Sequence, residues 1–373
     1  MMVDIYTDLA EELHAVRNDA ALLDMSPLSK YLVTGTDAGR FVNHIITRDA
    51  TQIEPDQVVF TPWCDERGHV NAEGLITRIG DTYRFSSNPM AEWFARWSEP
   101  FEVEIHDVSD HLGIVSLQGP RAFDVLERAT AESWQGFPFS RRRVTRIAGA
   151  EVDVIRQGFT GEQGFELWVQ AQDAGRVWDA LLDSGQPGIR PAGLHAIDLA
   201  RLEGGMIIGG PDYTPATVDS LGSKSDPFLS EEYKSTPGEV GMGRFVDLEK
   251  PSFVGRDALV AEAETGGPKR RLVGLELDWR DMVRSFLDRD IPPHLPPRAV
   301  WDPQPVFVGD QKVGRATSVA WSPTLSRLIG FGCINRELVD AGTQVTVGWP
   351  IGDAVVAVDT VVSELPFIAM RRS

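Results

Sequence analysis

Positive charge, cysteine and long apolar runs are all scarce in this sequence, and each scarcity argues against a class of protein. The 373 residues carry 36 Lys and Arg against 55 Asp and Glu, a formal net charge of −19. Such a surface repels phosphate backbones and anionic membranes, so we expect no nucleic-acid or membrane partner. No apolar run approaches the length of a membrane span, and the first residues lack the pattern of a signal peptide. We therefore expect a cytoplasmic protein.

Metal ligands and common catalytic motifs are also scarce. Cys64 and Cys333 are the only cysteines, too few for a disulfide framework or a cysteine-based zinc site, and the seven histidines show no HExxH spacing. The sequence has no glycine-rich dinucleotide motif after a strand, no P-loop and no G-x-S-x-G elbow. We expect no bound metal.

The order of the predicted elements indicates an α+β protein. Helical spacing in the first segment is followed by mixed strands and helices up to about residue 208. Residues 214–240, rich in Ser, Pro, Gly and charge, predict a long surface loop, which is usually functional or disordered. From 271 onwards, short strands separated by turns predict a small β-barrel or sandwich.

Two stretches hold polar residues beside apolar strand patterns. In GHVNAEGLI, residues 68–76, strict alternation predicts that His69, Asn71 and Glu73 share one face of a strand. A polar cavity would explain that face, but the pattern alone favours a solvated face of an antiparallel sheet.

The second stretch is GFTGEQGFELW, residues 158–168. One interpretation is a glycine-rich hairpin with solvated acids. The other is a turn that aims Glu166 at a ligand, because a carboxylate accepts two parallel N–H bonds from a ring amidine such as that of a pterin. The residue pattern does not choose between them.

Seven stretches in one order resemble the folate-binding aminomethyltransferase family, to which the T-protein of the glycine cleavage system belongs. They are LLDMSPLSKYLVTGTDAGRFVNHIITRD, FTPWCDERGHVNAEGLITRIGDTYRFSSN, LQGPRAFDVL, GFTGEQGFELW, GLHAIDLARLEGG, GMGRFVDLEKPSFVGRDAL and VGRATSVAWSPTLSRLIGFGCI. The resemblance runs from about residue 18 to the C-terminus. It implies a three-domain cloverleaf with tetrahydrofolate in a central channel and a C-terminal small β-barrel.

The implied domains follow that family fold. Domain 1, which binds folate, comprises 1–50 and 112–222. A ferredoxin-like domain 2 spans 51–111 and carries Glu73. A linker helix region and the barrel of domain 3 occupy 223–373.

The resemblance also assigns site residues. Glu73 stands at the position of the family's essential acid, and Glu166 at that of its pterin-binding glutamate. Phe159 replaces the tyrosine of the family's GYTGEDGFE, and Arg298 corresponds to an arginine that faces the folate or its anionic tail. Phe60, in FTPWC, completes the predicted folate-binding set.

Departures from the family pattern bear on the donor of the one-carbon unit. Ile197 replaces the arginine of ARDTLRLE, Arg244 replaces the tryptophan of GLGW, and Ala72-Glu73-Gly74 replaces the paired aspartates. These changes argue against aminomethyl transfer from a lipoyl protein. The pattern G-x-V-x-(small)-(acid)-G-(aliphatic), met by residues 68–75, resembles the tetrahydrofolate-dependent demethylases of the same family, and the segment LELDWRDMVRSFLD resembles their aryl demethylase branch. The chain length is nearer to the branch that acts on dimethylsulfoniopropionate.

Methyl transfer from an aryl ether releases a phenolate, which needs an acid, whereas a sulfonium leaves as a neutral sulfide. The candidate acids are Tyr213, Tyr233 and His69. Tyr233 lies in the predicted long loop, as expected of a lid residue. Glu73 is the candidate for polarising or deprotonating N5 of tetrahydrofolate.

We therefore expect a tetrahydrofolate-dependent methyltransferase that takes a methyl group from a small carboxylated donor, best represented by an aryl methyl ether. The alternatives are a dimethylsulfoniopropionate-type demethylase, an aminomethyltransferase acting on a glycine derivative, and a non-enzymatic folate-binding regulator. The expected partners are tetrahydrofolate and the donor, with the chain a monomer or a homodimer.

Overall fold

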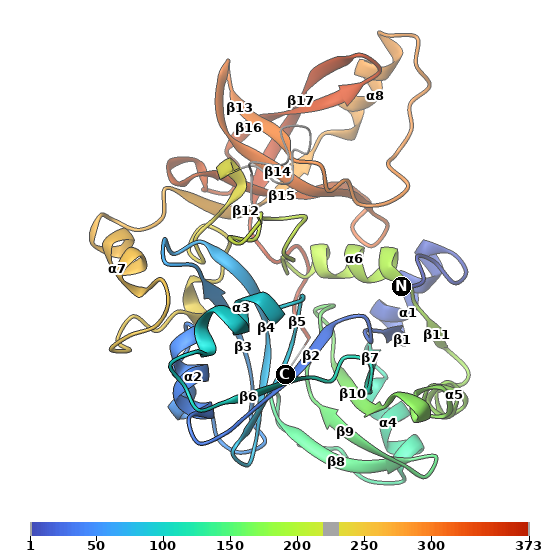
Figure 1. Cartoon of the computed structure of the whole chain (residues 1–373). Coiled ribbons are helices and arrows are strands. Elements are labelled where there is room, and N and C mark those ends of the chain that lie inside the picture. The colour runs from blue at the N-terminus through green and yellow to red at the C-terminus, as the bar shows by residue number, and fades with distance from the viewer. Residues whose placement is uncertain (1, 219–230, 372–373) are drawn as a thin grey trace.

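The computed structural model describes residues 2–218 and 231–371. The chain folds into three lobes, with two sheets in the lower half of Figure 1 and a barrel above them. The predicted α+β class and the C-terminal barrel are confirmed. Part of the predicted loop at 214–240, residues 219–230, lies outside the described residues.

The first sheet, sheet A, has six strands. Their order is β11 (Ile189–Pro191), β1 (Ala20–Asp24), β7 (Leu112–Gln118), β10 (Gly164–Gln170), β9 (Ala150–Ile155) and β8 (Arg142–Ile147). Helices α4 (Ala122–Thr130) and α5 (Ala174–Gly185) bury one face of the sheet, where alternate β10 residues such as Phe165 and Leu167 join the core. Side chains on the other face, including Trp168, point toward the second sheet.

The second sheet, sheet B, has five strands. Their order is β3 (Val58–Cys64), β4 (Val70–Ile79), β5 (Thr82–Ser87), β2 (Ser29–Thr34) and β6 (Glu104–Asp107). Helices α2 (Ala38–Ile45) and α3 (Ala91–Ser98) cover its outer face through a core rich in aromatic residues. Sheet membership differs from the predicted domain boundary at residue 50, because β2 pairs with β5 and β6.

The barrel is a closed ring of six strands. Their order is β12 (Arg270–Leu277), β15 (Arg327–Asn335), β14 (Gln311–Ser322), β13 (Gln304–Val308), β16 (Gln344–Ile351) and β17 (Ala354–Ser363). Helix α8 (Trp279–Leu287) is capped at its N-terminus by Asp278, whose carboxylate accepts from two backbone N–H groups, and it buries Met282 and Phe286 in the barrel core. The segment that resembles the demethylase branch is therefore a barrel element.

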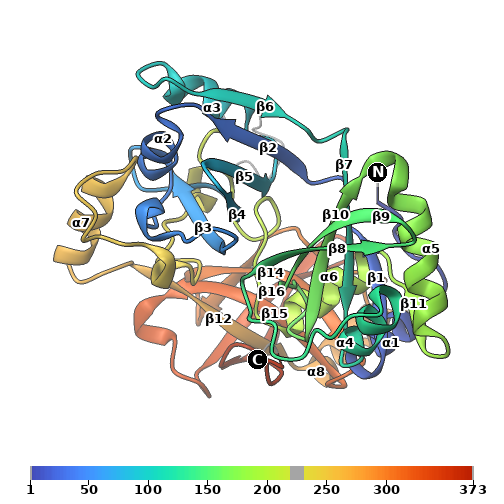
Figure 2. The same ribbon diagram turned by 90° about the horizontal axis from the view of Figure 1, so that it is seen from below.

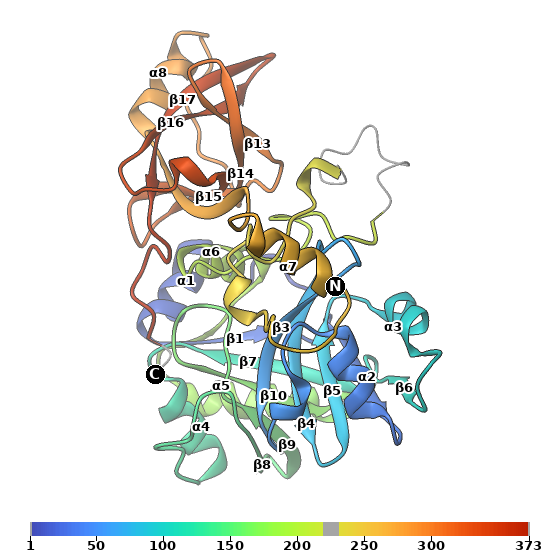
Figure 3. The ribbon, with the colours of Figure 1, turned by 90° about the vertical axis from the view of Figure 1, so that its left-hand side faces the viewer.

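The lobes meet around a shared apolar cluster. Helices α1 (Leu9–Asn18) and α6 (Leu194–Glu203) pack against each other beneath the barrel (Figure 3). Val70 of sheet B and Phe331 of the barrel join the same cluster. Helix α7 (Arg256–Glu264) lies on the outside, beside sheet B (Figure 2). Across the described residues we find no helix with the length and apolarity needed to cross a membrane.

Candidate functional site

The glycines of residues 158–164 make room for one buried amide. A Cβ atom at Gly158 or Gly164 would collide with the side-chain amide of Gln118, and Gly161 adopts a φ of +86° that favours glycine. The Gln118 amide donates to Ser116 Oγ and accepts from Thr160 Oγ1, each at 3.0 Å. This packing fixes the turn from which β10 begins.

Glu166 follows that turn on the face of sheet A that points toward sheet B. Its side chain is 8% exposed, and Oε2 is buried without a hydrogen-bond partner among the described residues. Burial raises the pKa of Glu166 to about 7, against weaker opposing effects of Trp168 and Arg84. A buried carboxylate oxygen with no donor is expensive in free energy, so the position suits an incoming ligand that supplies N–H groups.

Arg84 and Trp168 stand beside this carboxylate and connect the two sheets. Arg84 extends from β5, and its guanidinium carbon lies 4.1 Å from the centroid of the Trp168 ring. Its Nη1 donates to Asp153 Oδ2 of β9 at 2.7 Å. Its Nε and Nη2 are buried without partners in the described part of the chain. The Glu166 region therefore offers both an acceptor and donors.

Glu73 lies on β4, on the face of sheet B that points toward sheet A. Its carboxylate accepts hydrogen bonds from the Tyr213 hydroxyl and, at 3.1 Å, from the Gly209 backbone N–H. The side chain keeps some solvent exposure, but burial of its carboxylate raises the pKa to about 7 and the charge of Asp212 adds to the rise. A carboxyl group poised near neutral pH is suited to proton transfer.

A buried ionic network holds Tyr213 against Glu73. The neighbouring Asp212 accepts from Arg201 Nη1 at 2.6 Å, from Thr317 Oγ1 at 2.9 Å and from Ser318 Oγ at 2.6 Å. Arg201 lies on α6, and the two hydroxyls come from β14 of the barrel, so the loop before Tyr213 is fixed from two lobes. Contacts with α6 and with β14 of the barrel therefore set the position of the Tyr213 hydroxyl.

Aromatic side chains border the same central region. Phe60 and Phe159 are half-buried and pack against the central apolar cluster. The Phe60 ring meets the Phe245 ring edge-on, with centroids 5.1 Å apart. The register of β3 and β4 pairs Pro62 with Glu73 and Phe60 with Leu75, so Phe60 projects from the same face as Glu73.

The predicted alternation along residues 69–73 is wrong because β4 contains a bulge. Trp63 pairs with Ala72 and Cys64 with Val70, which leaves Asn71 as an extra residue. Val70 therefore enters the central cluster, whereas Ala72 enters the outer core of sheet B. Asn71 accepts from Thr217, and the charged neighbours of His69 include Asp65 and Arg67 rather than Glu73.

Tyr233 and Arg298 occupy other parts of the barrel interface. Tyr233 ends a short 3₁₀ helix, Glu231–Tyr233, and its half-buried ring lies 5.1 Å from the guanidinium carbon of Arg315. Arg298 is exposed on the segment before β13, where Val300 pairs with Val319. The structure gives neither residue a contact with Glu73 or Glu166.

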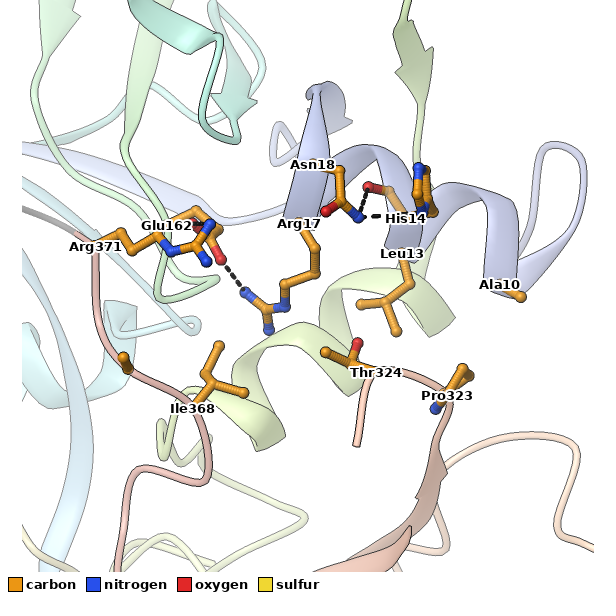
Figure 4. A pocket seen from close by; sticks show the side chains of 11 residues that line it. Ala10, Leu13, His14, Arg17, Asn18, Glu162, Pro323, Thr324, Ile368 and Arg371 are labelled. Carbon is orange, nitrogen blue, oxygen red and sulfur yellow. Dashed lines mark hydrogen bonds and ion pairs between the residues drawn. The ribbon is translucent and has the colours of Figure 1, made fainter. Parts of the chain in front are cut away.

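A cavity of about 520 Å³ lies elsewhere, between α1, the turn at 160–163, the loop after β14 and the C-terminal segment (Figure 4). Arg17 in its wall donates to Glu162 Oε1 at 3.2 Å, to Glu203 Oε2 at 2.8 Å and to the Thr160 carbonyl at 2.6 Å. Glu162 thus has a structural partner that Glu166 lacks, although the two acids are four residues apart.

Three arginines of this region were given no site role in the sequence analysis. Arg84 was visible only as an alternate residue of the strand TYRFSSN, and its stacking on Trp168 joins residues far apart in the chain. Arg48 and Arg244 both lie against Phe245. A signal was present for Arg244, because it replaces a family tryptophan; Arg48 carried none.

The chain belongs to the glycine cleavage T-protein family. Residues 3–220 match the family model described as the GCVT N-terminal domain, and residues 293–368 match that of the glycine cleavage T-protein C-terminal barrel domain. The resemblance drawn from the seven stretches is confirmed. The family is folate-dependent, and the chain is an enzyme of the transferase class, which sets aside the regulator alternative.

Relatives extend over nearly the whole chain. An aminomethyltransferase of Caldanaerobacter subterraneus subsp. tengcongensis is 31% identical over 350 residues, which is 92% of this chain and 84% of the relative. An aminomethyltransferase of Thermotoga petrophila is 30% identical, with 94% of this chain and 88% of the relative covered. The crystal structure of the glycine cleavage system aminomethyltransferase T from Bartonella henselae shares the fold, with a TM-score of 0.80 at 23% identity, over 99% of this chain and 92% of that one.

Proposed function

We propose that this protein transfers a one-carbon unit to tetrahydrofolate, with Glu166 as the residue that binds the pterin. The observation that carries the proposal is the buried Glu166 carboxylate, whose Oε2 has no donor among the described residues. A pterin presents two adjacent N–H donors, at N3 and the 2-amino group, which match the two oxygens of one carboxylate. The rings of Trp168, Phe159 and Phe60 offer flat apolar walls of the kind that such a ligand needs.

Glu73 and Tyr213 are proposed to act together at the reacting atoms. When bound, tetrahydrofolate supplies the N5 nitrogen that accepts the one-carbon unit. Glu73, with a pKa of about 7, holds or accepts a proton at that end of the site, and the Tyr213 hydroxyl fixes the orientation of its carboxylate. The apolar cluster around them excludes water from the transfer.

The finer proposal concerns the donor, which we infer to be a small carboxylated molecule with an O-methyl group, best an aryl methyl ether. The pattern of residues 68–76 and the loss of the family arginine at Ile197 support a demethylase. An ether leaving group needs a proton, and the Tyr213 hydroxyl at the Glu73 carboxylate is a candidate source. His69, Tyr233 and Arg298 stay proposals with less support, because none of their side chains is hydrogen-bonded to Glu73 or Tyr213 among the described residues. A dimethylsulfoniopropionate-type donor would need no acid.

Aminomethyl transfer is the second candidate, because the relatives named above are aminomethyltransferases. The two reactions leave different products. Methyl transfer yields 5-methyltetrahydrofolate, whereas aminomethyl transfer yields 5,10-methylenetetrahydrofolate.

Incubation with tetrahydrofolate and a panel of O-, S- and N-linked donors, followed by chromatography of the folates, separates these outcomes. We expect 5-methyltetrahydrofolate with an aryl methyl ether that bears a carboxylate. Exclusive formation of the methylene compound from an amine donor would contradict the demethylase proposal, and failure of the wild type to bind tetrahydrofolate would contradict the folate proposal.

A further inference from the structure

Two arginines share one aromatic ring near the centre of the molecule. The guanidinium carbons of Arg48 and Arg244 lie 5.0 Å and 4.6 Å from the centroid of the Phe245 ring. Neither side chain makes a hydrogen bond or ion pair with any described residue, and Arg48 Nε is buried without a partner. The chain has 55 acidic residues, so it is unusual that two arginines lie next to each other in space and neither forms an ion pair with a described carboxylate.

The pair is repulsive in the absence of a ligand. Burial lowers the pKa of Arg48, and the neighbouring charge of Arg244 lowers it further. Like charges brought together cost free energy, and a buried donor without an acceptor adds to the cost. An anion placed between the two guanidinium groups removes both penalties.

The backbone beneath the pair is firmly held. Lys250 Nζ donates to the carbonyls of Asn43, Ile46 and Arg48, each at 2.7 Å. Thr47 Oγ1 donates to the Phe245 carbonyl at 3.1 Å, which joins the segment after α2 to the 3₁₀ helix Gly243–Phe245. The two arginines therefore project from a rigid base.

Phe245, the ring that the two arginines share, lies on the same side of sheet B as the proposed reaction site. Phe245 meets Phe60 edge-on, and Phe60 projects from the same face of sheet B as Glu73. Arg244 is exposed, and Arg48 is half-buried, so the guanidinium groups are open to a molecule that enters from solvent. Phe60 and Phe245 supply an apolar surface beside the two charges.

We propose that Arg48 and Arg244 form a carboxylate-binding site that holds the anionic end of a ligand whose reacting end lies at Glu73. Guanidinium groups bind carboxylates through paired, charge-assisted hydrogen bonds. The inference rests on the proposed function for its two possible sources of the carboxylate, the glutamate tail of tetrahydrofolate and the carboxylate of the methyl donor.

The test measures affinities of the full-length wild type and of Arg48→Gln, Arg244→Gln and the double variant. Two pairs of probes separate the sources: tetrahydrofolate against 6-methyltetrahydropterin, which has no carboxylate, and 4-methoxybenzoate against its amide. Arg40→Gln is the matched control, because Arg40 also lies over a phenylalanine ring, 5.8 Å from the Phe101 centroid, but is paired with Asp37 at 2.6 Å.

In the Arg48 and Arg244 variants, loss of the charge-assisted bonds should lower the affinity for one charged probe by about 10- to 100-fold. The affinity for its uncharged counterpart should not change, and Arg40→Gln should bind all probes as the wild type does. Weakening of tetrahydrofolate alone identifies the glutamate tail, and weakening of the benzoate alone identifies the donor. The melting temperature should stay the same or rise, because a like-charge contact is removed. Equal losses for charged and uncharged probes, or no loss for either charged probe, would overturn the site.

A second measurement keeps this inference separate from the proposed function. Phenylglyoxal modifies arginines, and peptide mass spectrometry locates the modified positions. We expect glutarate to protect Arg48 and Arg244, but not Arg40, even if the wild type binds no pterin. Absence of that protection would overturn the inference, whereas a wild type that binds no pterin would overturn the folate proposal alone.

Discussion

Two buried acidic regions lie within four residues of each other in the chain and differ in how their charges are satisfied. Glu162 and Glu203 share Arg17, which also donates to two backbone carbonyls. Glu166 is also buried, and Oε2 of both Glu162 and Glu166 lacks a hydrogen-bond donor among the described residues, but Glu166 forms no ion pair with any of them. The first region joins α1, α6 and the 160–163 turn, and the second faces the other sheet.

The comparison teaches that burial alone does not distinguish a structural acid from a binding acid. Burial raises the pKa of Glu162 as well, but the Arg17 and Arg371 guanidinium groups oppose that rise. The Arg84 guanidinium near Glu166 is hydrogen-bonded to Asp153 and lies over the Trp168 ring. The absence of a paired cation, rather than burial or an oxygen without a donor, distinguishes Glu166 from Glu162.

Breaking the structural region should have the largest effect on stability. Arg17→Met leaves Glu162 and Glu203 buried without their shared cation, and we expect a loss of about 3–5 kcal/mol in the free energy of unfolding. Urea denaturation measures it. Arg371→Met is the control, because Arg371 is 62% exposed and lies 3.9 Å from Glu162. A loss below about 1 kcal/mol for Arg17→Met would show that the cluster is not structural.

Breaking the reactive region should affect rate instead of stability. Glu73→Gln keeps the shape of the side chain but removes its ability to accept a proton, so we expect transfer to slow by about 10²–10⁴-fold. The melting temperature should stay near that of the wild type. A steady-state assay measures the rate, and calorimetric melting measures the stability. If the variant is largely unfolded but its folded fraction turns over normally, Glu73 has a structural role.

The pH dependence of stability sharpens the contrast. The pKa of Glu166 is raised to about 7, so its contribution to stability is full below the unfolded value and is lost as pH rises through 7. Glu166→Gln should therefore gain about 1–3 kcal/mol relative to wild type between about pH 5 and about pH 8, in the absence of ligand. Urea denaturation of both proteins at the two pH values measures this change. If the difference in unfolding free energy between variant and wild type were the same at both pH values, the raised pKa of Glu166 would be contradicted.

Tyr213→Phe should have a smaller effect than loss of Glu73. Removal of the hydroxyl takes one donor from the Glu73 carboxylate, which raises the pKa of Glu73 and slows transfer by about tenfold. The acidic limb of the pH–rate profile should move to higher pH. Tyr233→Phe is the control, and an identical profile for Tyr213→Phe would remove the hydroxyl from the reaction.

Local patterns in the sequence were enough for some of this architecture. Short strands with turns predicted the barrel, and the GFTGEQGFE match singled out Glu166 as a candidate. The bulge at Asn71 was invisible, because period-two alternation contains no sign of an inserted residue. The assignment of β2 to sheet B and the approach of Arg48 to Arg244 depend on pairings between distant segments, which no single stretch encodes.

The central claim is that Glu166 binds the pterin and Glu162 does not, and calorimetric titration with tetrahydrofolate tests it most directly. The measurement compares wild type, Glu166→Gln and Glu162→Gln, with the folded fraction of each determined beforehand. We predict that Glu166→Gln loses about 1–3 kcal/mol of binding free energy, because the charge-assisted pair is lost, while the folded Glu162→Gln binds as the wild type does. Equal affinities for wild type and Glu166→Gln would contradict the account.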